Sequence, residues 1–193
     1  RDGFDIAGAT SGTYTLGETD VGTNIRVVVS YTDGHGTAES LTSAAVGPVA
    51  NVNDAPTGAP VVTGTATEDQ LLTANTATIA DADGLGTFSY QWQRDGFDIA
   101  GATSGTYTLG DADVGTNIRV VVSYTDGNGS TESLTSAAVG PIANVNDAPT
   151  GAPVVTGTAT EDQTLTANTG TIADADGLGT FSYQWQRNGV AIA

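Results

Sequence analysis

The sequence predicts an all-β protein made of antiparallel β-sandwich units that follow one another every 93 residues. Three observations predict this class. Residues 1–93 and 94–186 align without a gap and differ at 8 of the 93 positions, and a fixed period indicates a repeat array. Apolar and polar residues alternate over short stretches, as in half-buried strands. Glycine-rich turns separate these stretches, and about seven short strands in one unit are typical of a β-sandwich.

The N-terminal stretch contains three expected strands. Residues 12–16 form a short alternating strand, and residues 24–31 form a longer one. A period of two places the apolar side chains of the longer strand on one face: Ile25, Val27, Val29 and Tyr31. Residues 32–36 are rich in Gly and Asp, which predicts a hairpin turn. Residues 39–46 then return as the last strand before a break in the pattern.

That break is the hexapeptide Asn-Val-Asn-Asp-Ala-Pro, which occurs at residues 51–56 and again at residues 144–149. Proline stops the preceding strand, and Asn and Asp favour turns. We interpret the hexapeptides as a first and a second linker between units. They divide the chain into the C-terminal half of one unit, a complete unit and the N-terminal half of the next: residues 1–54, 55–147 and 148–193.

The complete unit begins with a short strand at residues 60–65 and an acidic turn at residues 67–70. Leu72 is the expected core residue of the next strand, because its neighbour Leu71 is replaced by a threonine in the second copy. A tight loop at residues 81–86 precedes an alternating stretch with three aromatic residues on one face: Phe88, Tyr90 and Trp92. The remainder of the unit repeats the N-terminal pattern, and no stretch has apolar residues at helical spacing.

Composition excludes several classes of function. The chain has 22 acidic residues, 5 basic residues and a net charge of −17. A nucleic-acid-binding surface would require a basic footprint, and an anionic membrane would repel such a chain. No apolar run approaches the ~20 residues that span a bilayer, and no signal peptide is apparent. Cysteine is absent, which excludes disulfide bonds and cysteine metal sites.

Catalysis has little support in the sequence. His35 is the single histidine, and its equivalent in the second copy is Asn128, which indicates a turn residue. No nucleophile and base pair can be assembled, and acids that recur in every copy suit a structural role. We therefore expect that the protein is not an enzyme. Trp92 and Trp185 are expected in the core rather than in a sugar-binding site, since Tyr90 and Phe88 share the face of Trp92.

Acidic residues concentrate in the loops, and the strands are nearly free of them. In a sandwich, alternate loops lie at opposite ends, so the turn at 68–69 and the loop at 110–113 should approach the second linker. The loop at 174–176 of the following unit should face the same linker. Such a junction offers the six to eight oxygen ligands that calcium (Ca²⁺) prefers. The alternatives are Asx turns and caps without a metal ion, or an acidic surface that only aids solubility.

The candidate calcium ligands are loop and linker residues with carboxylate or amide oxygens. In the central and C-terminal parts they are Glu68, Asp69, Asp111, Asp113, Asn144, Asn146, Asp147, Asp174 and Asp176. At the first linker they are Glu18, Asp20, Asn51, Asn53, Asp54, Asp81 and Asp83.

Three motifs together carry a family resemblance: Tyr-Gln-Trp-Gln-Arg-Asp-Gly at residues 90–96, Thr-Tyr-Thr-Leu-Gly-Asp-Ala-Asp-Val-Gly at 106–115, and the linker hexapeptide. The chain resembles the tandem cadherin-like or immunoglobulin-like repeats of giant bacterial (RTX-type) adhesins and related secreted repeat proteins. The resemblance implies an extracellular, calcium-stiffened extender used in cell adhesion and biofilms. The linker is one residue shorter than the cadherin pattern and has Asn for its leading Asp, which predicts fewer ions or weaker binding.

The expected function is therefore a structural extender or filament-forming segment of an extracellular adhesin or matrix protein. The alternative is a module whose exposed loops bind a carbohydrate or a cell surface. Neighbouring repeats are expected to complete the two terminal halves, through a covalent array or through strand exchange between identical chains. Residues 187–193 overlap residues 1–7 only imperfectly, which favours the covalent array. Lateral self-association of chains is a further candidate, whereas nucleic-acid binding and membrane insertion are not expected.

Overall fold

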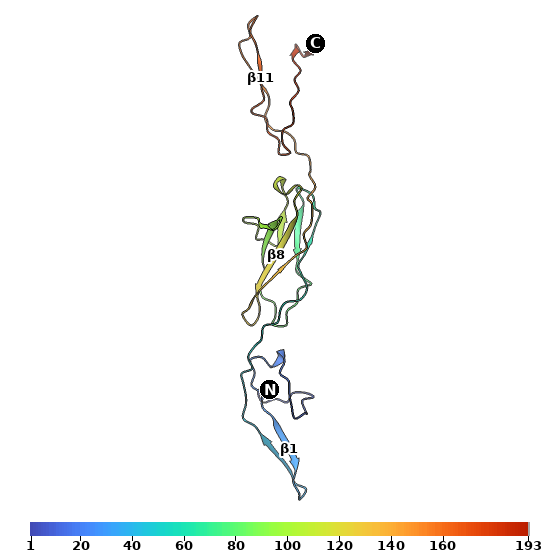
Figure 1. Ribbon diagram of the computed structural model, residues 1–193, viewed down its shortest axis with the longest axis vertical. Helices are drawn as coiled ribbons and strands as arrows, with labels where there is room; N and C mark the ends of the chain where they lie inside the picture. Colours follow the sequence, from blue (N-terminus) through green and yellow to red (C-terminus); the bar gives the residue numbers. More distant parts are fainter. Residues whose placement is uncertain (193) are drawn as a thin grey trace.

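The computed structural model describes residues 1–192, and the regular structure in this range is β-strand apart from two short 3₁₀ turns, η1 (Glu18–Asp20) and η2 (Asp111–Asp113). The expectation of an all-β chain is confirmed. Three groups of strands follow one another along one long axis in sequence order (Figure 1). Among the described residues, no helix is long and apolar enough to cross a membrane.

The central group contains two antiparallel sheets. The first sheet has three strands, in the order β3 (Val61–Thr63), β4 (Leu71–Asn75) and β7 (Thr106–Thr108). The second sheet has four strands, in the order β6 (Phe97–Asp98), β5 (Ser89–Arg94), β8 (Ile118–Thr125) and β9 (Thr131–Thr135). Residues 55–147 thus contain the expected seven strands.

Trp92 links the two sheets. In the four-stranded sheet Trp92 pairs with Val120 across β5 and β8, and its ring stacks on that of Tyr107 in the other sheet, with 5.7 Å between ring centroids. The indole N–H donates to the backbone oxygen of Ser104 (2.8 Å), so its burial leaves no polar group unsatisfied. Two sheets with a shared core are consistent with a β-sandwich.

The fully buried hydrophobic residues form one cluster within this central group: Leu72, Ile79, Trp92, Leu109, Ile118, Val120, Val122, Tyr124 and Ile142. Burial along β8 alternates residue by residue, as the sequence predicts for a half-buried strand. Leu72 is buried and Leu71 is about half exposed, which confirms the prediction that Leu72 is the core residue. The three-stranded and four-stranded sheets enclose this cluster between them.

In the described part of the chain, each flank contains only two-stranded sheets. On the N-terminal side, β1 (Val28–Thr32) pairs with β2 (Ala38–Thr42). On the C-terminal side there are two hairpins: β10 (Val154–Thr156) with β11 (Thr166–Asn168), and β12 (Gln186–Arg187) with β13 (Val190–Ala191). The strand expected at residues 12–16 is absent, and that expected at 24–31 begins only at Val28. In the central group, the equivalents of these segments are β7 and the first half of β8, which pair with β4 and β5 respectively. Among residues 1–192, no strands equivalent to β4 and β5 lie beside residues 1–54, so the same segments have no partner there.

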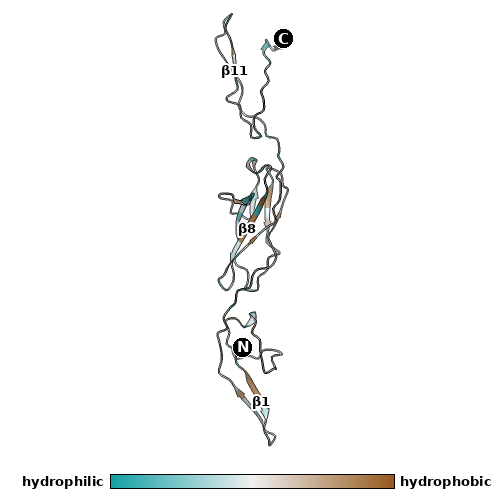
Figure 2. Ribbon diagram, in the orientation of Figure 1, coloured by the Kyte–Doolittle hydropathy of each residue, from teal (hydrophilic) through white to brown (hydrophobic). Residues whose placement is uncertain are grey.

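Side chains that are buried in the central group are exposed in the flanks. Val122 is 0% exposed and its equivalent Val29 is 55% exposed; Trp92 is 0% exposed and Trp185 is 39% exposed. Figure 2 shows the hydrophobic colouring of β1 at the outer end of the molecule. The flanks therefore carry the residues of a core without the sheet that covers it.

Candidate metal centres at the linkers

Each linker is held by an aspartate from the loop that follows it. The backbone N–H of Asp54 donates to Oδ2 of Asp83 (2.7 Å). In the second linker, the N–H of Asp147 donates to Oδ2 of Asp176 (2.8 Å). Asp83 and Asp176 occupy equivalent positions in the two copies, so the same contact forms at both linkers. A carboxylate that accepts a backbone N–H here orients the linker toward the next group of strands.

The loop that carries Asp83 is fixed by its own turn and by the hairpin between β8 and β9. Oδ1 of Asp81 accepts the N–H of Asp83 (2.9 Å), which is an Asx turn. The N–H of Gly127 donates to the backbone oxygen of Asp83 (3.0 Å), and a Cβ at residue 127 would lie 2.6 Å from that oxygen. Glycine is therefore required at this approach. Nδ2 of Asn128 donates to Oδ1 of Asp83 (2.8 Å).

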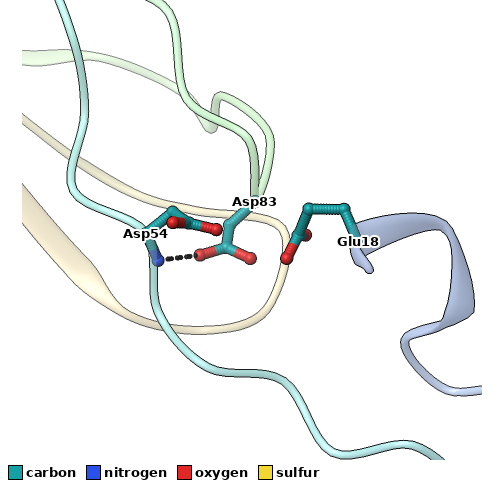
Figure 3. Close-up of side chains that lie close together, drawn as sticks. All are labelled: Glu18, Asp54 and Asp83. Atoms are coloured by element: carbon teal, nitrogen blue, oxygen red, sulfur yellow. Dashed lines mark hydrogen bonds between the residues drawn. The ribbon is translucent and has the colours of Figure 1, made fainter. Parts of the chain in front are cut away.

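Three carboxylates converge at the first linker: Glu18 from η1, Asp54 from the linker and Asp83 from the loop between β4 and β5. One oxygen of each lies within 4.8 Å of the others. Figure 3 shows the side chain of Glu18 reaching from the N-terminal group toward the two aspartates. We call these three residues the first cluster. The distances suit ligands of a single divalent cation, whose charge would offset their mutual repulsion.

The second cluster lies at the second linker and consists of Glu68, Asp111 and Asp147, again with one oxygen of each within 4.8 Å of the others. Glu68 comes from the turn before β4 and Asp111 from η2. The Glu68 N–H donates to the backbone oxygen of Ala143 (2.9 Å), which places the glutamate beside the segment that leads into the linker. Segments far apart in the sequence thus meet at one junction, as the sandwich topology predicts.

Glu68 is the most informative residue of the second cluster because it is only 1% exposed. Oε2 accepts the N–H of Val145 (3.1 Å). Oε1 is buried and has no hydrogen-bond partner in the structure. A buried carboxylate oxygen without a donor is costly. A cation shared with Asp111 and Asp147 would satisfy it.

The electrostatics of the second cluster favour a bound cation or proton. The Val145 N–H lowers the pKa of Glu68, but burial and the carboxylates of Asp111 and Asp147 outweigh it, so the pKa of Glu68 is raised. Burial also raises the pKa of Asp147, and the neighbouring carboxylates, led by Asp111 and Asp176, raise it further. Both shifts mean that the folded chain disfavours the fully ionised cluster when no cation is bound.

In the first cluster, too, one carboxylate has a raised pKa. Desolvation raises the pKa of Glu18, and the carboxylates of Asp83 and Asp54 raise it further. The pKa of Asp83 is lowered instead, mainly by the N–H of Asp54; burial opposes this effect, and the side chains of Asn128 and Asn51 add to the lowering. Asp83 therefore remains ionised most readily, and Glu18 is the group that a cation would stabilise in its charged form.

The two clusters are formed by equivalent positions of the 93-residue repeat. Asp111 is equivalent to Glu18, and Asp147 is equivalent to Asp54, at a distance of 93 residues. Asp176, which accepts the Asp147 N–H, is equivalent to Asp83 of the first cluster. At the second linker the set comprises four acids: Glu68, Asp111, Asp147 and Asp176. At the first linker three of the four occur, and the position of Glu68 has no equivalent among residues 1–54.

Two of the predicted ligands point away from the clusters. Asp113 is 1% exposed and accepts hydrogen bonds from Arg94 Nε (2.7 Å), Tyr107 Oη (2.9 Å) and the Gly110 N–H (3.0 Å). Its equivalent Asp20 is likewise buried and accepts from Tyr14 Oη (2.8 Å). The structure therefore does not bring either residue to a linker.

The other predicted aspartates surround the clusters without joining them. The N–H of Asp69 donates to the backbone oxygen of Leu109 (3.1 Å), and the residue adopts a φ of 62° in the left-handed region. Asp81 accepts a hydrogen bond from the Tyr124 hydroxyl. Oδ1 of Asp174 accepts the N–H of Asp176 (3.0 Å). These contacts shape the loops that carry the cluster residues.

The linker asparagines have different environments. Oδ1 of Asn51 is buried and has no partner in the structure, while its side chain lies against Asp83. Nδ2 of Asn53 donates to Oε1 of Glu132 (2.8 Å), and Nδ2 of Asn146 donates to the backbone oxygen of Asp147 (2.9 Å). Asn144 is exposed. Asn51 is thus the asparagine best placed to add a neutral oxygen ligand.

Sequence reasoning missed the supporting residues. Asn128, which holds Asp83, was interpreted only as a turn residue, and Glu132 was assigned no role. Asn128 is separated from Asp83 by 45 positions, so no local motif indicates their contact. The Asp-Gly-Asn-Gly sequence at 126–129 was a weak signal, because such a turn exposes amide donors at the end of a hairpin.

Comparison of the chain with protein-family models, with curated proteins and with solved structures gives no match. The geometry therefore defines the class by itself: an all-β chain of antiparallel sheets with two acidic clusters that could each hold a divalent cation.

Proposed function

We propose that the chain is a structural extender segment of an extracellular adhesin or matrix protein, stiffened by calcium at the linkers. In this proposal residues 55–147 are one complete β-sandwich unit, and residues 1–54 and 148–193 are halves of the units on either side. The 93-residue sequence period and the single core within residues 55–147 support this division. The family resemblance of the three motifs supports the extracellular assignment.

The observation that carries the proposal is the environment of Glu68. A carboxylate that is 1% exposed, with Oε1 unpartnered, lies among two other carboxylates at the joint between two groups of strands. Fold stability alone does not explain three acids in this position, since they repel one another. A calcium ion explains the acids, because hard cations bind carboxylate oxygens and Ca²⁺ tolerates irregular coordination.

Calcium at this position would have a mechanical consequence. Glu68 and Asp111 belong to the central group, Asp147 belongs to the linker, and Asp176 belongs to the loop that follows. An ion shared among them would tie the linker to the strands on both sides. Without the ion, repulsion among the same groups would allow the linker to bend. Calcium would thus convert a flexible chain of sandwiches into a stiff rod.

The test is calcium binding by the full chain, measured by calorimetry and by thermal unfolding. We expect Glu68→Gln to reduce the affinity of the second cluster at least tenfold, and to shrink the calcium-dependent rise in melting temperature. A ligand at ~100 times its Kd contributes ~2.7 kcal/mol to stability, which is easily measured. Glu39→Gln, at an exposed position of β2 outside both clusters, is the matched control. Identical calcium responses of wild type and Glu68→Gln would contradict the proposal.

A further inference from the structure

The hairpin between β8 and β9 contacts the first linker as well as Asp83. Nδ2 of Asn53 donates to Oε1 of Glu132 on β9 (2.8 Å). One residue further along the linker, the N–H of Asp54 donates to Asp83 (2.7 Å), which also accepts from Asn128 at the tip of the hairpin (2.8 Å). Figure 3 shows this hairpin in pale yellow, beside the linker and Asp83. Two consecutive linker residues are therefore bound to the group of strands that follows them.

Glu132 occupies an inward-facing position of β9. Burial along β9 alternates, and Glu132 and Leu134 are its two partly buried residues; Leu134 packs against the core. Glu132 lies opposite Tyr124 in the ladder with β8, and Tyr124 is 3% exposed. Pairing with a strand that is anchored in the core gives Glu132 a fixed position.

Two roles are open to a charge at this position. β9 is an edge strand of the four-stranded sheet, and an inward-pointing charge protects such an edge from pairing with another chain. That role requires no partner on the linker. The hydrogen bond between Asn53 and Glu132 indicates a second role, which is to hold the linker against the central group.

The contacts of the linker with the central group form without a cation. Asn53 and the N–H of Asp54 are neutral donors, and both donate to carboxylates. The group of strands before the linker meets the first cluster differently. Its residue Glu18 brings another carboxylate, and desolvation together with the charges of Asp83 and Asp54 raises the pKa of Glu18. A cation is needed on this side of the joint and not on the other.

We propose that Glu132 is a positioning residue of the first cluster: it accepts from Asn53 and thereby holds the first linker against the central group before a cation binds. Asp54 and Asp83 then stand close together in advance. Ligands that are already in place bind a cation more tightly, because less of the chain has to be ordered on binding. The effect on cation binding rests on the proposed calcium function, whereas the hold on the linker does not.

This role of Glu132 also places the bend of the joint. At the second linker the N–H of Val145 donates to Glu68 of the preceding group (3.1 Å). The equivalent of Val145 at the first linker is Val52, the residue before Asn53. In a repeat array the preceding unit thus holds a linker up to this valine, and the following unit holds it from the asparagine onward. Bending in the absence of calcium is concentrated at the peptide between these two residues.

The hold on the linker is measured by amide hydrogen exchange of the full chain in chelator, followed by NMR. We expect the Asp54 amide to be protected in wild type. Glu132→Ala removes the acceptor and should speed exchange at Asp54 about threefold to tenfold, as the net contribution of one hydrogen bond implies. The Ile118 amide, which donates to Val139 (2.9 Å), reports on the core sheet and should be unaffected.

Glu132→Gln is the matched control, because it removes the charge and keeps an oxygen that can accept from Asn53. Exchange at Asp54 should then be that of wild type. Exchanging donor and acceptor extends the test: Asn53→Asp alone opposes two carboxylates and should speed exchange at Asp54, and adding Glu132→Gln should restore protection. Unchanged exchange in Glu132→Ala overturns the proposal, and so does equal acceleration in Glu132→Gln, which would assign the effect to charge.

Calcium titration by calorimetry tests the effect on the first cluster. In the background of Glu68→Gln, which weakens the second cluster, we expect Glu132→Ala to reduce the remaining affinity about threefold to tenfold and Glu132→Gln to leave it unchanged. Calcium binding that is insensitive to Glu132→Ala would overturn the positioning role and leave the proposed function standing. If wild type binds no calcium and Glu132→Ala still speeds exchange at Asp54, the proposed function fails and the hold on the linker stands.

Discussion

Asp111 and Asp113 are two residues apart in η2 and serve different purposes. Asp111 faces the linker, where its oxygen lies near those of Glu68 and Asp147. Asp113 faces the interior and forms an ion pair with Arg94 at 2.6 Å. A 3₁₀ turn has three residues per turn, so residues two apart point in different directions. Arg94 and Tyr107 supply the donors that a buried carboxylate requires.

The contrast between Trp92 and Trp185 yields a stability prediction at single residues. Trp92→Ala removes a fully buried side chain from the centre of the core and should lower the free energy of unfolding by ~3–5 kcal/mol. Trp185→Ala makes the same change at a partly exposed position and, in dilute solution, should cost much less. Urea unfolding of the two variants checks this. Equal costs would show that Trp185 is buried in solution as Trp92 is.

At the scale of elements, the linkers matter because three different elements converge on each. The turn before β4, the 3₁₀ turn η2 and the linker supply the second cluster. Asp176 and Glu68 accept N–H groups of the linker, whereas the other two elements adjoin paired strands. The ladder between β4 and β7 positions the turn before β4 and η2, and their acids meet at the linker as a result. The cluster can therefore gain or lose a cation without unfolding the sheets.

The raised pKa values of Glu68 and Asp147 predict the pH dependence of stability in the presence of a chelator. The folded chain holds protons on these groups at a higher pH than the unfolded chain does. Their contribution to the free energy of unfolding should therefore increase as the pH falls from 7 toward about 4.5. Chemical unfolding at several pH values measures the effect, and Glu68→Gln should reduce it.

Aspartates with a lowered pKa have the opposite effect on the free energy of unfolding, and they exert it at a more acidic pH. The Gly17 N–H lowers the pKa of Asp20, and the Asp54 N–H lowers that of Asp83. Their stabilisation is lost only as the pH falls below about 4. Stability without calcium should thus pass through a maximum at mildly acidic pH. A continuous fall in stability from pH 7 downward would contradict this balance.

At the scale of the whole molecule, the groups of strands are joined end to end by linkers without regular structure (Figure 1). The length of such a chain in solution depends on how freely the linkers bend. Small-angle scattering should give a larger maximum dimension in calcium than in chelator. Asp147→Ala should remove the difference at the second linker and leave the core of the central group folded. If chelator changes neither the melting temperature nor the scattering length, calcium does not stiffen the chain.

Much of the fold was predictable from local patterns. Alternation around Val120 and Val122 predicted a half-buried strand, and the aromatic series ending at Trp92 predicted the strand that pairs with it. The acids of the first and second clusters were all among the predicted ligands, because loops at one end of a sandwich must meet. The inward orientation of Asp113 was not predictable, since its partner Arg94 lies 19 positions away and no local pattern connects them.

The sequence by itself determined the alternating stretches, the turns, the linkers and the 93-residue period, because these depend on side-chain alternation and on residues such as Gly, Asn and Pro that act locally. Which of the stretches form strands depended on the tertiary structure, since residues 12–16 form no strand and the equivalent β7 does. Tertiary structure alone decided which acids meet, which are neutralised by Arg94 and which apolar faces are covered. Val29 and Val122 occupy identical local sequence and differ from exposed to buried. Burial depends on what packs against a strand, and in this chain the covering sheet lies beside one copy of that sequence and not beside the other.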